Sequence, residues 1–149
     1  MRVGIRVPMI ATWPRYIKKK SETNHISAFQ DFYSTVCDII DTDIPKSVNG
    51  ISFLPTLIGE NQKKHNYLYW EIEGKGGQQA IRYGKWKGLK KNLKKGKQTL
   101  KLYNLETDLK ELNDVSNDYP EIVDNLEILL KEAHTCLLYT SDAADEGHC

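Results

Sequence analysis

Cysteine is scarce in this sequence and lacks the spacings that its chemistry requires. The 149 residues contain three, Cys37, Cys136 and Cys149, with no CxxC pair and no His at metal-site spacing. An odd number with wide gaps favours neither a disulfide framework nor a zinc site. We interpret Cys37, which falls within a predicted helix, as a small buried core residue rather than a reactive thiol.

Long apolar runs and a targeting signal are also missing. The apolar runs fall far short of the roughly 20 residues that span a bilayer. The N-terminal MRVGIRVPMIATWP lacks the apolar core and cleavage site of a signal peptide. We therefore predict no membrane contact, and the chain carries no visible address. With 40% hydrophobic and 28% charged residues, the composition is typical of a soluble globular domain.

Catalytic and metal-binding motifs are absent as well. The sequence contains no GxxxxGK[ST], no HExxH and no GxSxG, and no close group of Asp and Glu able to hold a divalent metal. His25, His65 and His134 are isolated from one another in sequence, and we interpret them as solvated or capping residues. The sequence therefore predicts no catalytic residue and no metal site within this chain.

Basic charge is concentrated in one segment. The formal net charge is +1, but between Gly74 and Leu105 there are ten Lys or Arg and no Asp or Glu. Clustered positive charge binds polyanions by releasing their counterions, so Lys90, Lys91, Lys94 and Lys95 are candidate contacts for nucleic acid or a sulfated glycan. The alternative is a solvated hairpin whose lysines discourage edge-to-edge strand pairing.

The pattern of apolar residues in the first half of the chain predicts one strand and one helix. The run GIRVPMIATW is typical of a buried strand. A helix is predicted from about Ala28 to Ile40, with Ser27 and Gln30 as a capping box. Its predicted apolar face comprises Phe29, Phe32, Tyr33, Val36, Cys37 and Ile40. The strand and this face both need a partner surface, so we expect them to be loose without one.

The second half of the chain alternates with period two and then becomes helical. Three antiparallel strands are predicted, in YLYWEIE, QQAIRYGKWKGLK and TLKLYNL. A helix follows from about Asp118, and its apolar stripe would cover one face of the sheet. The stripe comprises Ile122, Val123, Leu126, Leu129, Leu130 and Ala133. The fold class predicted for these residues is α+β.

Six segments in series resemble the C-terminal part of the arylsulfatase-type sulfatases. They are GIRVPMIATWP, HISAFQDFYSTVCDI, DIPKSVNGISFLPTLIG, YLYWE, QAIRYGKWK and LYNLETDLKELNDVSNDYPEI. The family patterns are approximately EGGxRVPxIxxWPG, a D-x-x-PT helix, a DGxSxxPxLxG loop, a YWE strand, an xRxGxWK strand and LYxLxxDxxExxNxxxxxPE. Order and spacing agree over about residues 4–134. Among the departures, Arg15 stands where Gly follows Trp-Pro.

The resemblance implies a parent enzyme with an alkaline-phosphatase-like α/β fold that hydrolyses sulfate esters of a small molecule or glycan. Family members use a formylglycine made from Cys or Ser in C/S-x-P-S-R and a calcium ion held by Asp and Asn, all upstream of the matched part. No Cys or Ser here is followed by x-P-S-R. The resemblance thus implies a C-terminal fragment of a sulfuric ester hydrolase that is inactive alone, with a last core strand and helix before the small sheet.

Three positions carry over from the family as substrate-cleft candidates. Arg6 matches the Arg of the GGxR turn, His25 the His before the D-x-x-PT helix, and Arg82 the Arg of the xRxGxWK strand. Each could equally be a salt-bridged or capping residue. The resemblance assigns residues 1–60 to the end of the catalytic domain and 61–135 to the C-terminal subdomain. It also suggests a periplasmic or extracellular place for a bacterial parent. The alternative function is a stand-alone basic binding module.

The closing stretch differs from everything before it. CLLYTSDAADE, residues 136–146, resembles the translation of a sequencing adapter and continues no pattern of the preceding helix. We therefore expect residues 136–149 to be a non-native tail without function.

Overall fold

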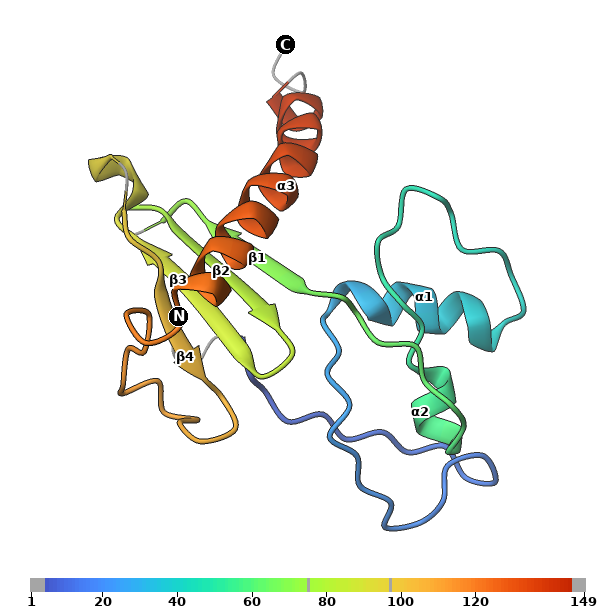
Figure 1. Ribbon diagram of the computed structural model, residues 1–149. Helices are drawn as coiled ribbons and strands as arrows, with labels where there is room; N and C mark the ends of the chain where they lie inside the picture. Colours follow the sequence, from blue (N-terminus) through green and yellow to red (C-terminus); the bar gives the residue numbers. More distant parts are fainter. Residues whose placement is uncertain (1–4, 75, 97, 146–149) are drawn as a thin grey trace. The chain divides into compact units, whose positions relative to one another are not determined.

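The computed structural model describes residues 5–74, 76–96 and 98–145, with side chains described as far as His134. It divides into two compact units. One comprises Arg6–Asn66, and the other comprises Ile5 together with the described chain from Tyr67 onward. Figure 1 shows the elements of both. None of the helices in the described residues is long and apolar enough to cross a membrane.

The sheet unit contains four antiparallel strands in the order β1-β2-β3-β4. Their bounds are Leu68–Ile72 (β1), Gln78–Tyr83 (β2), Trp86–Lys91 (β3) and Lys101–Asn104 (β4), with a short 3₁₀ helix, η1, at Leu93–Lys95. The prediction of a single middle strand in QQAIRYGKWKGLK is wrong, because this segment forms two strands, β2 and β3, that pair as a hairpin. Tyr83 pairs with Trp86 across a two-residue turn that begins at Gly84, with φ of +55°, a conformation that glycine adopts without steric cost.

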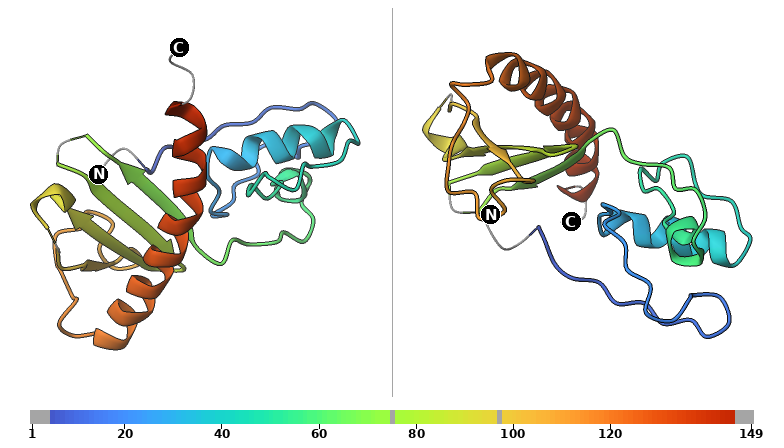
Figure 2. Two further views of the ribbon diagram at one scale, coloured as in Figure 1. Left: turned by 90° about the horizontal axis from the view of Figure 1, so that it is seen from above. Right: turned by 60° about the horizontal axis from the view of Figure 1, so that its bottom comes forward.

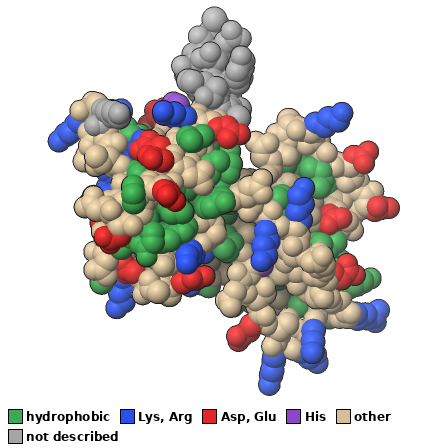
Figure 3. Space-filling model, in the orientation of Figure 1, with side chains coloured by type: hydrophobic (Ala, Val, Ile, Leu, Met, Phe, Trp, Pro, Cys, Tyr) green, Lys and Arg blue, Asp and Glu red, His purple; other side chains and the backbone are tan. Residues whose placement is uncertain are grey.

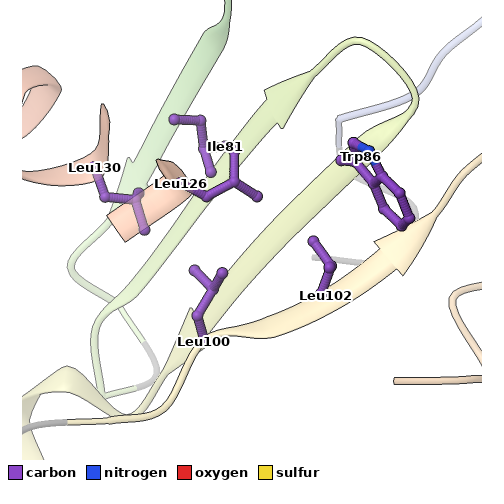
Figure 4. Packing of buried hydrophobic residues seen from close by; sticks show 6 residues of the cluster. All are labelled: Ile81, Trp86, Leu100, Leu102, Leu126 and Leu130. Carbon is purple, nitrogen blue, oxygen red and sulfur yellow. The ribbon is translucent and has the colours of Figure 1, made fainter. Parts of the chain in front are cut away.

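Helix α3, Pro120–Asp145, lies across one face of this sheet, as the two views in Figure 2 show. The predicted stripe is confirmed, since Leu126, Leu130 and Ala133 are buried. The core beneath the helix consists of Ile81, Trp86, Leu100, Leu102, Leu126 and Leu130, and Figure 4 shows these side chains between helix and sheet. Full burial of each leucine stabilises the unit by about 1.5–3 kcal/mol.

Two polar side-chain contacts fix the register of α3 on the sheet. His134 Nδ1 lies 2.9 Å from Glu71 Oε2, and Lys90 pairs with Glu127. Glu127 and His134 lie about two helical turns apart and so share a face. Glu71 is opposite Gln79 in the β1–β2 ladder, and Gln79 is opposite Lys90 in the next. Glu71 and Lys90, which lie in one row across the sheet, thus each find a polar partner on the helix.

The Glu71 carboxylate is the most heavily bonded group in this arrangement. It accepts hydrogen bonds from the Tyr69 hydroxyl and from His134. Burial alone would raise the pKa of Glu71, but the hydrogen bonds from Tyr69, His134 and Gln79 outweigh it and lower that pKa. Burial and the adjacent carboxylate raise the pKa of Tyr69, so its hydroxyl remains a donor at neutral pH.

A pH-dependent contribution to stability follows for Glu71. Its folded pKa lies below the ordinary value, so the ionised carboxylate stabilises the fold above the unfolded pKa of about 4.3. That stabilisation is lost as the pH falls through the folded pKa. We expect Glu71→Gln to lower the free energy of unfolding at pH 7 and to lower it less at pH 3.5, as measured by urea denaturation. A deficit of the same size at both pH values would contradict this, and Glu73→Gln controls for loss of a nearby negative charge.

The other unit is built around helix α1, Gln30–Ile39, and the short helix α2, Leu54–Ile58. The predicted helix is confirmed, but the predicted capping box is wrong, because α1 has no side-chain cap at its N-terminal residue. The strand predicted over GIRVPMIATW is not formed in the described residues 5–13. A strand needs a neighbour for its backbone groups, and β1 to β4 pair only with one another.

Helix α1 buries its polar side and exposes its apolar side. Phe29, Phe32 and Ile40 are 93%, 58% and 64% exposed. Cys37 is buried and is a free cysteine, as predicted, but its buried neighbours on the helix are Asp31, Ser34 and Thr35. The expectation that the apolar face lacks a partner surface agrees with this exposure.

Candidate functional site

The unit formed by residues 6–66 is organised around one buried carboxylate, that of Asp31 in the first turn of α1. Asp31 is fully buried. Its Oδ2 accepts a hydrogen bond from the Ala28 amide at 2.7 Å, and its Oδ1 accepts one from the Ile51 amide at 2.9 Å. His65 Nε2 lies 2.8 Å from the same Oδ1. A carboxylate can accept several such bonds at once, so Asp31 joins three separate segments of the chain.

The next turn of α1 extends this attachment. The Thr35 hydroxyl donates to the Asp31 carbonyl at 2.7 Å and accepts from the Phe53 amide at 3.0 Å. The Ser34 hydroxyl donates to the Gly50 carbonyl at 2.9 Å. The polar side of α1 therefore supplies the hydrogen bonds that the loop at residues 50–53 does not make within itself.

Gly50 sits where no other residue fits. A Cβ at this position would lie 2.2 Å from the backbone oxygen of Gln30 and 2.9 Å from the Ser34 hydroxyl. Backbone approach this close requires glycine. Asp31, Thr35 and Gly50 are the residues at which the sequence matches the D-x-x-PT and DGxS patterns, and their role here is to lock loop to helix.

His25, one of the three substrate-cleft candidates, precedes α1 and is half-buried. Burial lowers the pKa of its imidazole, and Asp31 opposes that effect while His65 and Lys64 add to it. The ring is therefore neutral at neutral pH and can donate one hydrogen bond and accept another. His65, by contrast, is a structural residue, because its ring is largely buried against Asp31.

The other two candidates, Arg6 and Arg82, lie far from this cluster in the sequence, and Arg82 also belongs to the other unit. Arg6 is exposed in the same unit as His25. Arg82 is in β2 of the sheet unit, where its Nε donates to the Gly84 carbonyl at 3.3 Å. The two units are described separately, so the prediction that Arg6, His25 and Arg82 face one cleft stays a prediction.

The basic segment is less available to a polyanion than its composition indicates. Lys87 is buried and lies 2.5 Å from Glu111, and Lys90 is held by Glu127. The carboxylate that holds Lys90 comes from a helix that is distant in sequence, and the predicted contact of Lys90 with a polyanion stays a prediction. Lys91, Lys94 and Lys95 are exposed, and their contact with a polyanion stays a prediction.

Among residues 5–74, 76–96 and 98–134, whose side chains the structure describes, no group of three or more His, Cys, Asp and Glu is arranged to hold a metal ion. Asp31, the most buried carboxylate in the cluster of α1, already accepts two amides and a His ring. The described residues thus do not fit calcium, and no step of a reaction is assigned to a metal here.

No site role is predicted from the sequence for Asp31, His65, Lys87 or Glu111. A signal was present for the first, since Asp31, Ser34, Thr35 and Asp38 repeat at helical spacing on one side of α1. Such a polar stripe usually faces water. Only the amides of residues 51 and 53, which Asp31 and Thr35 bind, show that the first three residues of this stripe are buried.

The solved structures that this chain resembles are those of alkaline-phosphatase-like sulfatases, and the chain itself contains a small four-stranded antiparallel sheet covered by a C-terminal helix. The match to a family model is more specific. Residues 2–135 match N-sulphoglucosamine sulphohydrolase, C-terminal, and the chain belongs to this family. The match ends at residue 135, while the assignment of residues 136–149 as a non-native tail stays a prediction, and residues 146–149 lie outside the described part.

The similar proteins are sulfatases. An ulvan-active sulfatase from Formosa agariphila is 36% identical over 67 residues, covering 45% of this chain and 14% of the relative. An N-acetylgalactosamine-6-O-sulfatase from Bacteroides thetaiotaomicron is 25% identical over 146 residues, covering 89% of this chain and 28% of the relative. The solved structure of a 2-O GAG sulfatase superposes with a TM-score of 0.60 at 25% identity, covering 79% of this chain and 26% of that one. The chain spans between about one seventh and about a quarter of their lengths.

Proposed function

We propose that this chain is the C-terminal part of a sulfatase that hydrolyses sulfate esters of a glycan. The observation that carries the proposal is the family match over residues 2–135. Two of the similar proteins are named for an amino sugar and for glycosaminoglycans, which favours a sulfated glycan over a small aryl sulfate as the substrate.

The exposed apolar face of α1 supports a larger parent. Phe29 and Ile40 are 93% and 64% exposed, and Ile10 in the extended segment is 93% exposed. Large apolar side chains this exposed favour a surface that another part of a protein covers. We propose that the remaining part of a sulfatase catalytic domain covers this apolar face. Residues 1–60 would complete that domain, and residues 61–135 would form the C-terminal subdomain.

In the proposed parent, a formylglycine and a calcium ion supply the nucleophile and the Lewis acid, from residues outside this chain. This chain's own contribution is positional. The bonds of Asp31 to the Ala28 and Ile51 amides fix the start of α1 and the loop at residues 50–53. The side chain of His25 belongs to the segment just before that start, and strand β2 carries the side chain of Arg82. We propose that these side chains contact the sugar and that the chain alone releases no sulfate. For a bacterial parent, a periplasmic or extracellular location is proposed.

The coding sequence upstream of Met1 tests this function. An in-frame C/S-x-P-S-R codon series is expected there, and the joined protein should release sulfate from a sulfated oligosaccharide while the present chain releases none. An in-frame stop directly upstream, with no such series in any frame, would refute the proposal. Conversion of the motif Cys or Ser to Ala in the joined protein is the matched control for background hydrolysis.

A further inference from the structure

The segment at residues 13–16 adopts a turn that its sequence makes unfavourable. The Tyr16 amide donates to the Trp13 carbonyl at 3.1 Å, Pro14 is second in the turn, and Arg15 is third with φ of +80°. These are the features of a type II turn, whose third position normally requires glycine. The family pattern that this segment resembles has Gly after Trp-Pro, and an exposed arginine stands in its place here.

A second turn follows with the same character. The Ser21 amide and hydroxyl both donate to the Lys18 carbonyl, at 3.3 Å and 2.8 Å, and Lys20 has φ of +59°. Two exposed basic residues within one loop thus hold left-handed backbone conformations. Such conformations are unfavourable for residues with a Cβ and persist mainly at functional sites.

The aromatic residues of the first turn are stacked beside these charges. The rings of Trp13 and Tyr16 lie 4.2 Å apart between centroids with 28° between their planes. Tyr16 remains 59% exposed, so the pair presents an aromatic surface to a ligand. A fixed aromatic pair loses little conformational entropy when it is covered, which favours its use in binding.

The cations of this loop are not neutralised by neighbouring acids. Arg15, Lys18, Lys19 and Lys20 are exposed, and no ion pair joins them to a carboxylate in the described part of the chain. In the sheet unit, by contrast, Lys85, Lys87, Lys90 and Lys101 are all paired. Lys and Arg side chains project at the lower right of Figure 3, where this loop lies in Figure 1.

We propose that residues 13–20, the aromatic-basic loop, bind a sulfated glycan chain. The exposed aromatic surface would contact the apolar face of a sugar ring, and the guanidinium and ammonium groups would bind sulfate through charge-assisted hydrogen bonds. This inference rests on the proposed function, which favours a sulfated glycan over other polyanions as the ligand. The loop would hold a long substrate by a second contact outside the residues proposed to face the cleft.

Arg15→Gly tests the loop without the usual ambiguity of a destabilised variant. Glycine accepts the positive φ, so the melting temperature of the full chain should be unchanged or raised. Affinity for a heparin-derived hexasaccharide, measured by calorimetry, should fall about fivefold or more, and the slope of log affinity against log salt concentration should drop by about 1. Lys46→Gly, which removes one exposed charge from another loop of the same unit, is the matched control and should change affinity less than twofold.

Two further probes decide what is recognised. Desulfated hexasaccharide should bind at least tenfold more weakly, and polyphosphate of equal charge should bind more weakly than the sulfated sugar. Tyr16→Ala should remove that preference for sugar. The proposal is overturned if Arg15→Gly leaves the affinity unchanged or if polyphosphate binds as tightly.

The proposed function and this inference can fail separately. If Arg15→Gly leaves the rate of sulfate release by the joined enzyme unchanged on both long and short substrates, the role of the loop is overturned. The sulfatase assignment then remains intact. Binding at the loop in a joined protein that releases no sulfate would do the reverse.

Discussion

Lys87→Met is expected to destabilise the sheet unit by about 3–5 kcal/mol, because it leaves a buried carboxylate without its counter-ion. The side chain of Lys87 is 2% exposed and that of Glu111 is 8% exposed, with Nζ 2.5 Å from Oε1. Water cannot replace the ammonium at such a site. Hydrogen exchange of the Ile81 and Leu102 amides, which lie in the paired strands, should accelerate accordingly.

Two companion variants identify the cause. Lys87→Met combined with Glu111→Leu removes both charges and should recover most of the lost stability, since a buried pair is often replaceable by apolar residues. Lys85→Met is the matched control, because Lys85 is exposed and lies 4.0 Å from Glu106. It should cost no more than about 1 kcal/mol. If Lys87→Met destabilises the unit no more than Lys85→Met does, the buried pair contributes nothing to stability.

The distance in sequence between Lys87 and Glu111 explains why the pair could not be predicted. The pattern of β3 shows a lysine alternating with apolar residues, which is also typical of a strand with one solvated face. Glu111 lies in an irregular loop, where it has φ of +54°, and no period locates its carboxylate. The helix over the sheet was predictable because Leu126, Leu130 and Ala133 repeat at a helical spacing that needs no knowledge of the partner.

The missed hairpin has a related explanation. Ile81 pairs with Gly88, and Tyr83 pairs with Trp86, so the residues on the helix side are odd-numbered before the turn and even-numbered after it. A two-residue turn changes this parity. The sequence QQAIRYGKWKGLK contains the change at Gly84, where alternation read as one strand places Trp86 on the wrong face.

The candidate site shows the opposite case, in which a regular pattern was misleading. Helix α1 was predicted from its apolar residues, and the helix is there, but its apolar side is exposed and its polar side is buried. The spacing of apolar and polar residues defines the two faces of a helix. It does not show which face packs against other residues of this chain. The family motifs marked Asp31 and Thr35 as constrained positions, while their physical role depends on amides at Ile51 and Phe53.

Asp31→Asn should release the loop at residues 50–53 from α1 and lower the stability of that unit on the order of 3 kcal/mol. An amide side chain has one acceptor oxygen, whereas Oδ1 and Oδ2 of Asp31 receive the Ile51 and Ala28 amides separately. The new NH₂ group must face one of these donors, and a buried donor without a partner costs about 1–3 kcal/mol. The bond to His65 is lost or weakened as well.

Hydrogen exchange of single amides reads this outcome directly. Protection of the Ile51 amide should fall in Asp31→Asn, and that of the Ile81 amide in the sheet unit should not change if the two units unfold independently. Asp38→Asn is the matched control, because Asp38 is exposed on the same helix and binds only the Ser52 hydroxyl among the bonds described. Its effect should stay within about 1 kcal/mol. Equal loss of protection at Ile51 in both variants would show that the buried position of Asp31 is not what holds the loop.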